Sequence, residues 1–264
     1  MRIFNDPMKN ELSMNKIPYR IDLAGGWLDQ PFVSKHHHGS VITISIEPDI
    51  EFSHRSGMAT STRNKAIELW QNHIPEGDRE RLAKILFCFE NPPGSKFISG
   101  SQDSLGIVFP GLNKYFYEGD YWPTKSESCL DEEILSWIEN HIYLIALGPR
   151  VDSFDVLEGT ELNKINAQAL ADATDKVWEA LLAKDLNSFG QAFTQSFEAQ
   201  IKMFPNMITN SILDTIASYK DKALGWKLTG AGGGGYIILI SQEPIENSLR
   251  IKIKRYRKWK QNSH

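Results

Sequence analysis

Apolar side chains recur at helical spacing in two long stretches of the second half of the chain. The first stripe consists of Leu170, Ala173, Val177 and Leu181, and the second of Phe189, Phe193, Phe197, Ile201 and Phe204. Pro205 ends the second stretch, because proline cannot continue a helix. The spacing predicts two helices that each turn one apolar face to the core.

A shorter helix is predicted in the first half. Asp78 precedes the segment RERLAKILFCFE, and Pro92-Pro93-Gly94 follows it. The segment carries apolar side chains at helical spacing, namely Leu82, Ile85, Leu86 and Phe89. An aspartate before such a run is a common N-cap, and the prolines stop the helix.

Three segments have strand patterns. Isoleucines alternate with Thr43 and Ser45 between Ile42 and Ile46, which predicts a half-buried strand. Continuous apolar runs at 143–147 and 236–240 predict buried strands. The stretch 118–134 is rich in loop-forming residues, so we place a domain boundary near Asn140. We expect an α+β protein with domains at 1–140 and 141–264.

The composition indicates a folded globular protein. The chain has 264 residues, of which 41% are hydrophobic and 23% charged, and its net charge is −4. This balance excludes disorder and coiled coil, and it gives no field that would attract nucleic acid or an anionic membrane. No apolar run is long enough to cross a bilayer, and the opening 16 residues lack the apolar stretch of a signal peptide. We expect a cytoplasmic protein with reduced thiols at Cys88 and Cys129, and a basic last segment, 250–260, that is a solvated final element.

A glycine cluster precedes the last predicted strand. Gly230, Gly232 and Gly235 have the GxGxxG spacing of dinucleotide sites, but a strand-like run follows them where that fingerprint requires a helix. From the residues alone, a structural tight turn and a phosphate-binding loop are both open.

Three segments, in order, resemble motifs of the GHMP kinase superfamily. PYRIDLAGGWLDQP, residues 18–31, is similar to its first motif, and KLTGAGGGGY, residues 227–236, to its third. SGSQDSLGIVFPGLN, residues 99–113, resembles the segment that carries the catalytic aspartate. The AGGW-x-D form is similar to the fucokinase and heptose-phosphate kinase branch. The resemblance implies a two-domain GHMP-kinase-like fold with a shortened N-terminal half.

The resemblance implies roles for two charged residues in phosphoryl transfer. Asp103 matches the catalytic aspartate that accepts the proton of the acceptor hydroxyl. Arg20 matches an arginine whose charge keeps that aspartate ionised and stabilises the transition state. Without the resemblance, Asp103 is a turn or helix cap and Arg20 a surface arginine.

The first motif also supplies the substrate-binding residues that the resemblance implies. Asp29 matches an aspartate that hydrogen-bonds sugar hydroxyls, although alone it could be a turn residue. Gly26 and Trp27 replace the Glu-His of galactokinases, which argues against galactose.

The resemblance further implies ATP and Mg²⁺ as cofactors. Third-motif glycines and the imperfect second motif SGMATSTRNKAIELW would hold the phosphates: Gly57, Thr60, Ser61, Gly230, Gly232, Gly233 and Gly234. Ser61 and Glu90 would hold the metal. The alternatives are a turn that caps a helix from Asn64 onward and a solvated glutamate at a helix end. Ala59 stands where the family has a glycine.

The leading hypothesis is an ATP- and magnesium-dependent small-molecule kinase that acts on a sugar or sugar phosphate. Only 28 residues separate Asp29 from Gly57, fewer than is usual in the family. A catalytically degenerate relative with a ligand-binding or regulatory role is therefore the alternative. A decarboxylase of the same superfamily has no sequence feature in its favour.

Overall fold

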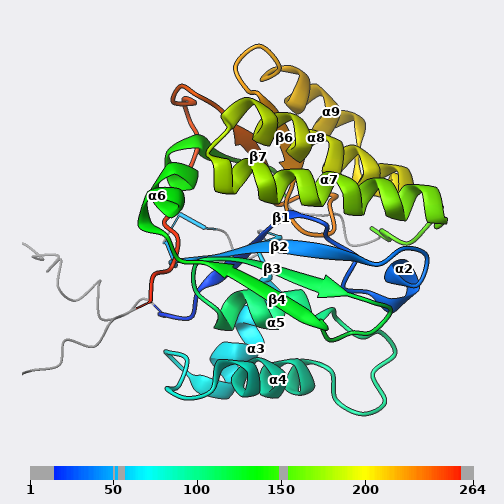
Figure 1. Cartoon of the computed structure of the whole chain (residues 1–264), viewed down its shortest axis with the longest axis vertical. Helices are drawn as coiled ribbons and strands as arrows, with labels where there is room; N and C mark the ends of the chain where they lie inside the picture. Colours follow the sequence, from blue (N-terminus) through cyan, green and yellow to red (C-terminus); the bar gives the residue numbers. More distant parts are fainter. Residues whose placement is uncertain (1–14, 50, 53–56, 149–153, 257–264) are drawn as a thin grey trace, which may run out of the picture.

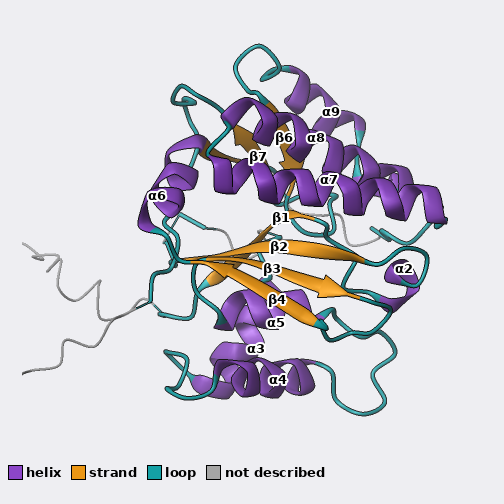
Figure 2. Ribbon diagram, in the orientation of Figure 1, coloured by secondary structure: helices purple, strands orange, loops and turns teal. Residues whose placement is uncertain are grey.

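The computed structural model describes residues 15–49, 51–52, 57–148 and 154–256. Two antiparallel sheets are found in this part of the chain (Figures 1 and 2). The first has the order β1-β2-β3-β4, with β1 at Tyr19–Ala24, β2 at Gly39–Ile46, β3 at Leu112–Tyr117 and β4 at Lys125–Cys129. The second has the order β5-β7-β6, with β5 at Ile142–Ala146, β7 at Tyr236–Ile240 and β6 at Gly225–Leu228.

Helices separate the sheets and cover the outer face of the larger one (Figure 1). The helices α7 (Lys164–Ala183) and α8 (Leu186–Met203) lie between the sheets, α7 against β2 and α8 against β6. On the opposite face, α5 (Ser101–Val108) packs on β1 and β2, and α3 (Thr60–Trp70) and α4 (Arg79–Glu90) pack beyond it. The remaining helices are α2 (Pro31–Ser34), α6 (Glu132–His141), α9 (Asn210–Ala217) and the 3-10 turn η1 (Pro205–Met207).

The two helices predicted from the long apolar stripes are confirmed as α7 and α8. Every stripe position is buried except Ile201, which is half-buried. The helix after Asp78 is confirmed as α4, and the Asp78 carboxylate accepts a hydrogen bond from the Arg81 N–H. Its predicted stripe is partly wrong, because Ile85 and Phe89 are exposed while α4 buries Ala83 and Leu86.

The three predicted strands are confirmed within β2, β5 and β7, but the predicted half-burial of β2 is wrong. All residues of β2 after Gly39 are buried, including Thr43 and Ser45. The reason is that α5 covers one face of this central strand and α7 the other. Alternation of polar and apolar residues therefore does not mark a solvated face here.

The stretch at 118–134 is loop-rich only in part: residues 118–124 and 130–131 are bends or loops. It contains the edge strand β4, whose residues are exposed or half-buried, and the start of α6, which Asp131 caps. An exposed edge strand needs no apolar alternation, so its sequence resembles a loop. The boundary near Asn140 stays a prediction. One apolar cluster includes residues of β1 and β2 together with residues of β5 and β7.

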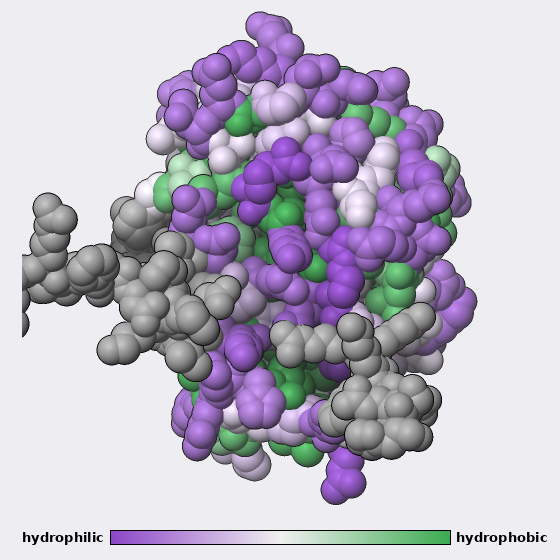
Figure 3. All heavy atoms as spheres, turned by 90° about the vertical axis from the view of Figure 1, so that its left-hand side faces the viewer, coloured by the Kyte–Doolittle hydropathy of each residue, from purple (hydrophilic) through white to green (hydrophobic). Residues whose placement is uncertain are grey.

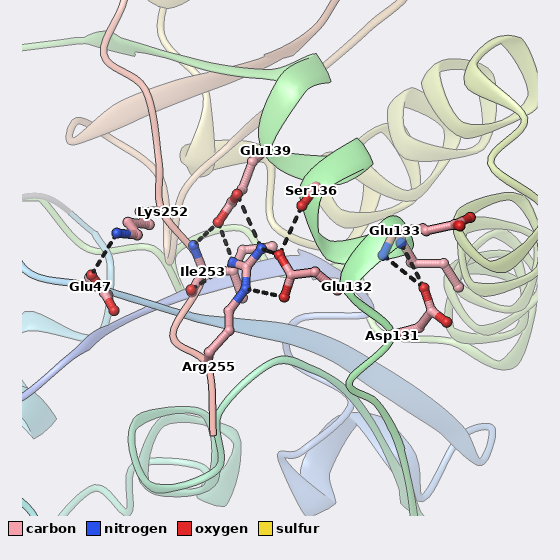
Figure 4. A network of polar contacts seen from close by, with 10 residues as sticks. Glu47, Asp131, Glu132, Glu133, Ser136, Glu139, Lys252, Ile253 and Arg255 are labelled. Atoms are coloured by element: carbon pink, nitrogen blue, oxygen red, sulfur yellow. Dashed lines mark hydrogen bonds and ion pairs between the residues drawn. The ribbon is translucent and has the colours of Figure 1, made fainter. Parts of the chain in front are cut away.

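Residues 250–256, the described part of the basic final segment, lie against the molecule through two buried isoleucines, contrary to the expectation of a solvated element. Ile251 and Ile253 are buried, and Ile253 pairs with Ile46 of β2. Arg255 forms ion pairs with Glu132, at 2.7 Å, and with Glu139 (Figure 4). The last eight residues, 257–264, and the opening stretch, 1–14, lie outside the described residues.

The surface on the left-hand side of Figure 1 is largely hydrophilic where it is described, with small separate hydrophobic patches (Figure 3). None of the helices that the structure describes is both long enough and apolar enough to span a bilayer.

Candidate active site

A buried ion pair lies where β1 meets α5. Arg20, on β1, is only 3% exposed, and its guanidinium contacts the carboxylate of Asp103 in the first turn of α5. The N-cap of α5 is Gly100, so Asp103 does not cap this helix. The interpretations of Asp103 as a cap and of Arg20 as a surface arginine are therefore both wrong.

The field around Arg20 is dominated by acidic groups. Burial lowers the pKa of Arg20, and the carboxylates of Asp22, Asp29 and Glu90 act in the opposite direction. An arginine keeps its proton in proteins, so the guanidinium provides a fixed positive charge among these acids.

Thr62 connects Asp103 to Glu90. The Thr62 hydroxyl donates to Glu90 Oε1 at 2.8 Å and lies 3.5 Å from Asp103 Oδ2. Burial raises the pKa of Glu90, whereas hydrogen bonds from the hydroxyls of Thr62, Ser99 and Ser61 lower it. Glu90 is thus half-buried and faces the Arg20–Asp103 pair, unlike a solvated helix end. Thr62 was not predicted as a site residue, because its partner Glu90 lies 28 positions away in the sequence.

The helix α3 begins at Thr60, so Thr60 and Ser61 form its first turn and not a turn that caps a helix from Asn64. Ser61 is exposed and Thr60 half-buried. The N-cap, Ala59, has φ 55° and ψ 37°, the left-handed conformation that favours glycine. The alanine that replaces the family's glycine therefore keeps the backbone of a glycine.

The predicted phosphate loop packs closely against the glycine cluster, where the nearest atom to a Cβ on Gly57 would be the Thr229 hydroxyl oxygen, at 2.7 Å. A Cβ on Gly57 would lie 2.9 Å from the Thr229 carbonyl oxygen, and one on Gly230 2.7 Å from that of Gly57. Both glycines have positive φ, so a side chain at either position would be strained as well as crowded. In the rest of the cluster, the Gly233 N–H donates to the Met207 carbonyl, and Gly232 and Gly234 are buried.

Asp29 lies beside the same helix start as Asp103. It is 1% exposed, and its Oδ1 accepts a hydrogen bond of 2.8 Å from Gln102 Nε2. Burial raises the pKa of Asp29 to about 6, while Arg20 and the Gln102 backbone act in the opposite direction. A surface turn residue would not have this environment. Gln102, which precedes Asp103, belongs to the matched segment 99–113 but was not predicted as a site residue.

Gly26 and Trp27 occupy the turn between β1 and Asp29. A Cβ on Gly26 would lie 2.2 Å from Asp22 Oδ2, and the Gly26 carbonyl accepts from Gln200 Nε2 at 3.0 Å. Trp27 has φ 82°, and its ring stacks on Phe204 with a centroid distance of 4.3 Å. Gly26 therefore lies against the buried Asp22, whereas Trp27 packs on an aromatic ring.

A second buried ion pair, which the sequence analysis missed, joins β1 to β6. Lys227 is fully buried, and its Nζ donates to Asp22 Oδ2 at 2.9 Å, to the Leu228 carbonyl at 3.2 Å and to the Asp22 carbonyl at 3.4 Å. Burial lowers the pKa of Lys227 against the attraction of Asp22. Arg20 and Asp22 are two positions apart on β1, and side chains at this spacing in a strand point to the same face. This spacing was the sequence signal that could have linked Asp22 to the site of Arg20.

The oxygen ligands offered by Glu90, Asp103 and Ser61 suit Mg²⁺ better than a metal that needs a full set of protein ligands. Among the described residues, no three His, Cys, Asp or Glu side chains cluster as a metal site. Mg²⁺ usually takes one or two carboxylates and completes its shell with substrate phosphates and water. Glu90 and Asp103, bridged by Thr62, provide two carboxylates, and the Ser61 hydroxyl lies near Glu90.

A hollow of about 800 Å³ elsewhere on the described surface is lined by residues such as Lys16, His73, Arg79 and Lys254. None of the predicted site residues lines it.

Comparisons with known proteins agree with this fold. Residues 178–252 match the family model described as GHMP kinases C terminal. No curated protein matches the chain.

Several solved kinases have the same fold. An L. major mevalonate kinase in complex with R-mevalonate is 14% identical, with a TM-score of 0.59, and the match covers 92% of this chain and 97% of that one. A Lactococcus lactis galactokinase complexed with galactose is 17% identical, with a TM-score of 0.57, and the match covers 86% of this chain and 84% of that one. A D-glycero-D-manno-heptose 1-phosphate kinase from Bacteroides thetaiotaomicron is 14% identical, with a TM-score of 0.54, and the match covers 86% of this chain and 87% of that one.

These identities are too low to select one branch, but the architecture agrees along most of each chain. The chain thus has the mixed α+β, two-sheet fold of the GHMP kinases, and its C-terminal part matches the C-terminal model of that family.

Proposed function

We propose that this protein is an ATP- and magnesium-dependent kinase that transfers a phosphoryl group to a hydroxyl of a sugar or sugar phosphate. The observation that carries the proposal is the contact between Arg20 and Asp103 beside the Thr62–Glu90 hydrogen bond. It places a carboxylate, a fixed positive charge and a second carboxylate at the start of α5. Phosphoryl transfer needs these groups, because its catalysis consists mainly of positioning and charge neutralisation.

Asp103 would accept the proton of the acceptor hydroxyl. As that oxygen forms its bond to the γ-phosphorus of ATP, the bond from phosphorus to the bridging oxygen breaks and ADP leaves. Arg20 would stabilise the negative charge on the transferred group and keep Asp103 ionised. Bound Mg²⁺ would neutralise phosphate charge, with Glu90 and Ser61 as its protein ligands.

The phosphates would lie at the start of α3. Helix N-termini attract anions, and the N-cap Ala59 has no side-chain oxygen to occupy the first N–H groups. Side chains cap α4, α6, α7, α8 and α9, whereas α5, like α3, has no side-chain cap. The contact between Gly57 and Gly230 would hold this loop against the glycine cluster. The N-terminal half, 1–140, would then supply the reacting groups and the half 141–264 the glycine wall.

Within the family, the AGGW-x-D motif supports a relationship to the fucokinase and heptose-phosphate kinase branch. Asp29 would bind the acceptor, with Gly26 and Trp27 shaping the turn before it. This assignment depends on sequence similarity of the motif and on the burial of Asp29 beside Gln102.

Isothermal titration of the protein with MgATP, followed by coupled detection of ADP with a panel of sugars, tests the proposal. We expect saturable MgATP binding and ADP release that depends on an added sugar. Failure to bind at millimolar MgATP would refute it.

The second candidate is a non-catalytic ligand-binding protein. It is favoured by the short connection from Asp29 to Gly57, which holds only α2, β2 and adjoining loops among its described residues. Acceptor-dependent ADP release that Asp103→Asn abolishes would eliminate this candidate.

A further inference from the structure

Thr62 lies where three helices meet. It is buried in the first part of α3, while Glu90 ends α4 and Asp103 belongs to the first turn of α5. Each of these helices packs on the other two. The Thr62 Oγ1 atom lies 2.8 Å from Glu90 Oε1 and 3.5 Å from Asp103 Oδ2. One hydroxyl therefore faces two carboxylates that come from different helices.

This arrangement differs from that of another buried threonine in a helix. Thr174 of α7 is as fully buried as Thr62, and its hydroxyl donates to the Leu170 carbonyl one turn earlier in the same helix, at 2.7 Å. Such a bond to the carbonyl four residues back is the usual way in which a helical threonine satisfies its hydroxyl. Thr62 instead links side chains that are distant in the sequence.

The Thr62 hydroxyl has one proton, so it can donate to only one of the two carboxylates at a time. The shorter distance assigns the proton to Glu90, because 3.5 Å is too long for a strong bond between a hydroxyl and a carboxylate. Asp103 already has a charged partner in Arg20. Thr62 therefore acts mainly on Glu90, which lies at the C-terminal end of α4, where the helix dipole disfavours a negative charge.

Glu90 keeps its second oxygen for a ligand. Its Oε2 atom is buried and makes no hydrogen bond within the described part of the chain. A buried carboxylate oxygen without a partner is costly, and a bound cation would remove that cost. The hydroxyl of Thr62 and a cation can bind the two oxygens of Glu90 at the same time.

We propose that Thr62 is the positioning residue of the magnesium site, because its hydroxyl holds the Glu90 carboxylate in place for the metal. The inference rests on the proposed kinase function and adds a residue to its metal site. A group that orients a metal ligand commonly changes metal affinity by about 10- to 100-fold. Since Thr62 acts through Glu90, loss of its hydroxyl should weaken metal binding and leave the binding of metal-free ATP unchanged.

The ratio of ATP affinities with and without Mg²⁺ tests this role without turnover. ATP is titrated calorimetrically in millimolar Mg²⁺ and in EDTA into the wild type, Thr62→Val and Thr62→Ser. Valine keeps the shape of threonine without the hydroxyl, and serine keeps the hydroxyl. We expect Thr62→Val to lower the ratio by about 10-fold or more while the Kd of metal-free ATP stays within about twofold, and Thr62→Ser to restore the ratio. Thr174→Val, which removes an equally buried hydroxyl, is the matched control and should keep the wild-type ratio.

A double-mutant cycle with Glu90→Gln shows whether Thr62 acts through Glu90. Glutamine still offers an oxygen to the Thr62 hydroxyl but lacks the charge, so Glu90→Gln alone should also lower the ratio. In that background, Thr62→Val should lower it further by less than about twofold, because residues that act through one another have non-additive effects. Additive effects, or a wild-type ratio in Glu90→Gln, would overturn the inference.

The outcomes separate this inference from the kinase proposal. A wild type that binds ATP no more tightly with Mg²⁺ than in EDTA refutes the kinase proposal and the inference with it. A wild-type preference for MgATP that Thr62→Val retains, or that Thr62→Ser fails to restore, overturns the inference alone. If Thr62→Val does not fold, the smaller Thr62→Ala takes its place in the same comparison and has the same expected result.

Discussion

Replacement of Lys227 by methionine would test whether the buried ion pair between β6 and β1 stabilises the fold. Lys227 and Asp22 are 0% and 3% exposed in their side chains, and the ammonium has three oxygen acceptors. In Lys227→Met, the Asp22 carboxylate stays buried without its cation. Breaking a buried pair in this way typically costs about 3–5 kcal/mol of unfolding free energy.

The expected loss is large enough to measure in two ways. For a protein of this size, 1 kcal/mol changes Tm by about 2–4 °C, so Lys227→Met should melt roughly 6–20 °C below the wild type. Urea unfolding followed by circular dichroism gives the free energy itself. Lys222→Met, at an exposed lysine just before β6, is the matched control and should stay within about 0.5 kcal/mol of wild type.

A double variant separates the pair from the packing of the lysine stem. Asp22→Leu combined with Lys227→Met leaves no buried charge, and hydrophobic replacement of a buried pair is often neutral or stabilising. We expect the double variant to be more stable than either single variant. A loss below about 1 kcal/mol in Lys227→Met, or a double variant worse than both singles, would show that the ion pair does not act as described.

Three further changes probe the site. Burial raises the pKa of Asp29 from an unfolded value near 3.8 to about 6. The protonated carboxyl therefore contributes its full stabilisation below about pH 4, and the unfolding free energy decreases by about 3 kcal/mol as the pH rises through 6. Asp29→Asn should flatten this part of the pH dependence of urea unfolding, and an unchanged slope would contradict it. Ala59→Gly should raise the unfolding free energy by about 0.5–1 kcal/mol, because it relieves a left-handed alanine; a decrease would show that the backbone there is not strained. Asp103→Asn should reduce kcat by about 100-fold or more and also lower Tm, because it leaves the charge of Arg20 buried without its partner. Full activity in this variant would remove Asp103 from catalysis.

The elements with strong periodicity were predictable from the sequence, and those without it were not. The stripes of α7 and α8 and the apolar runs of β5 and β7 gave the correct elements, because burial requires apolar side chains at fixed intervals. Edge strand β4 escaped prediction, since its exposed side chains carry no such constraint. The burial of β2 depends on helices that pack on it from distant parts of the chain, which local alternation cannot report.

The same distinction between local pattern and long-range contact holds for the site. Motif similarity proposed Arg20, Asp29 and Asp103 one at a time, and the structure adds that Arg20 and Asp29 each contact a residue in the first turn of α5; their roles stay predictions. Thr62 and Lys227 were not proposed from the sequence, because their contacts are with partners distant in sequence, Glu90 and Asp22.

For Lys227, the sequence could have predicted a buried acidic partner but not which residue it is. It opens the segment KLTGAGGGGY, and a lysine beside a buried strand requires a buried acid, since an unpaired ammonium is too costly to desolvate. Several acids could have met that requirement, and only the tertiary structure selects Asp22, two residues after Arg20 on the same strand. The selection has a functional consequence. One strand carries the partners of both Asp103 and Lys227, so a shift of β1 would disturb the proposed base and the strand that leads into the glycine loop together.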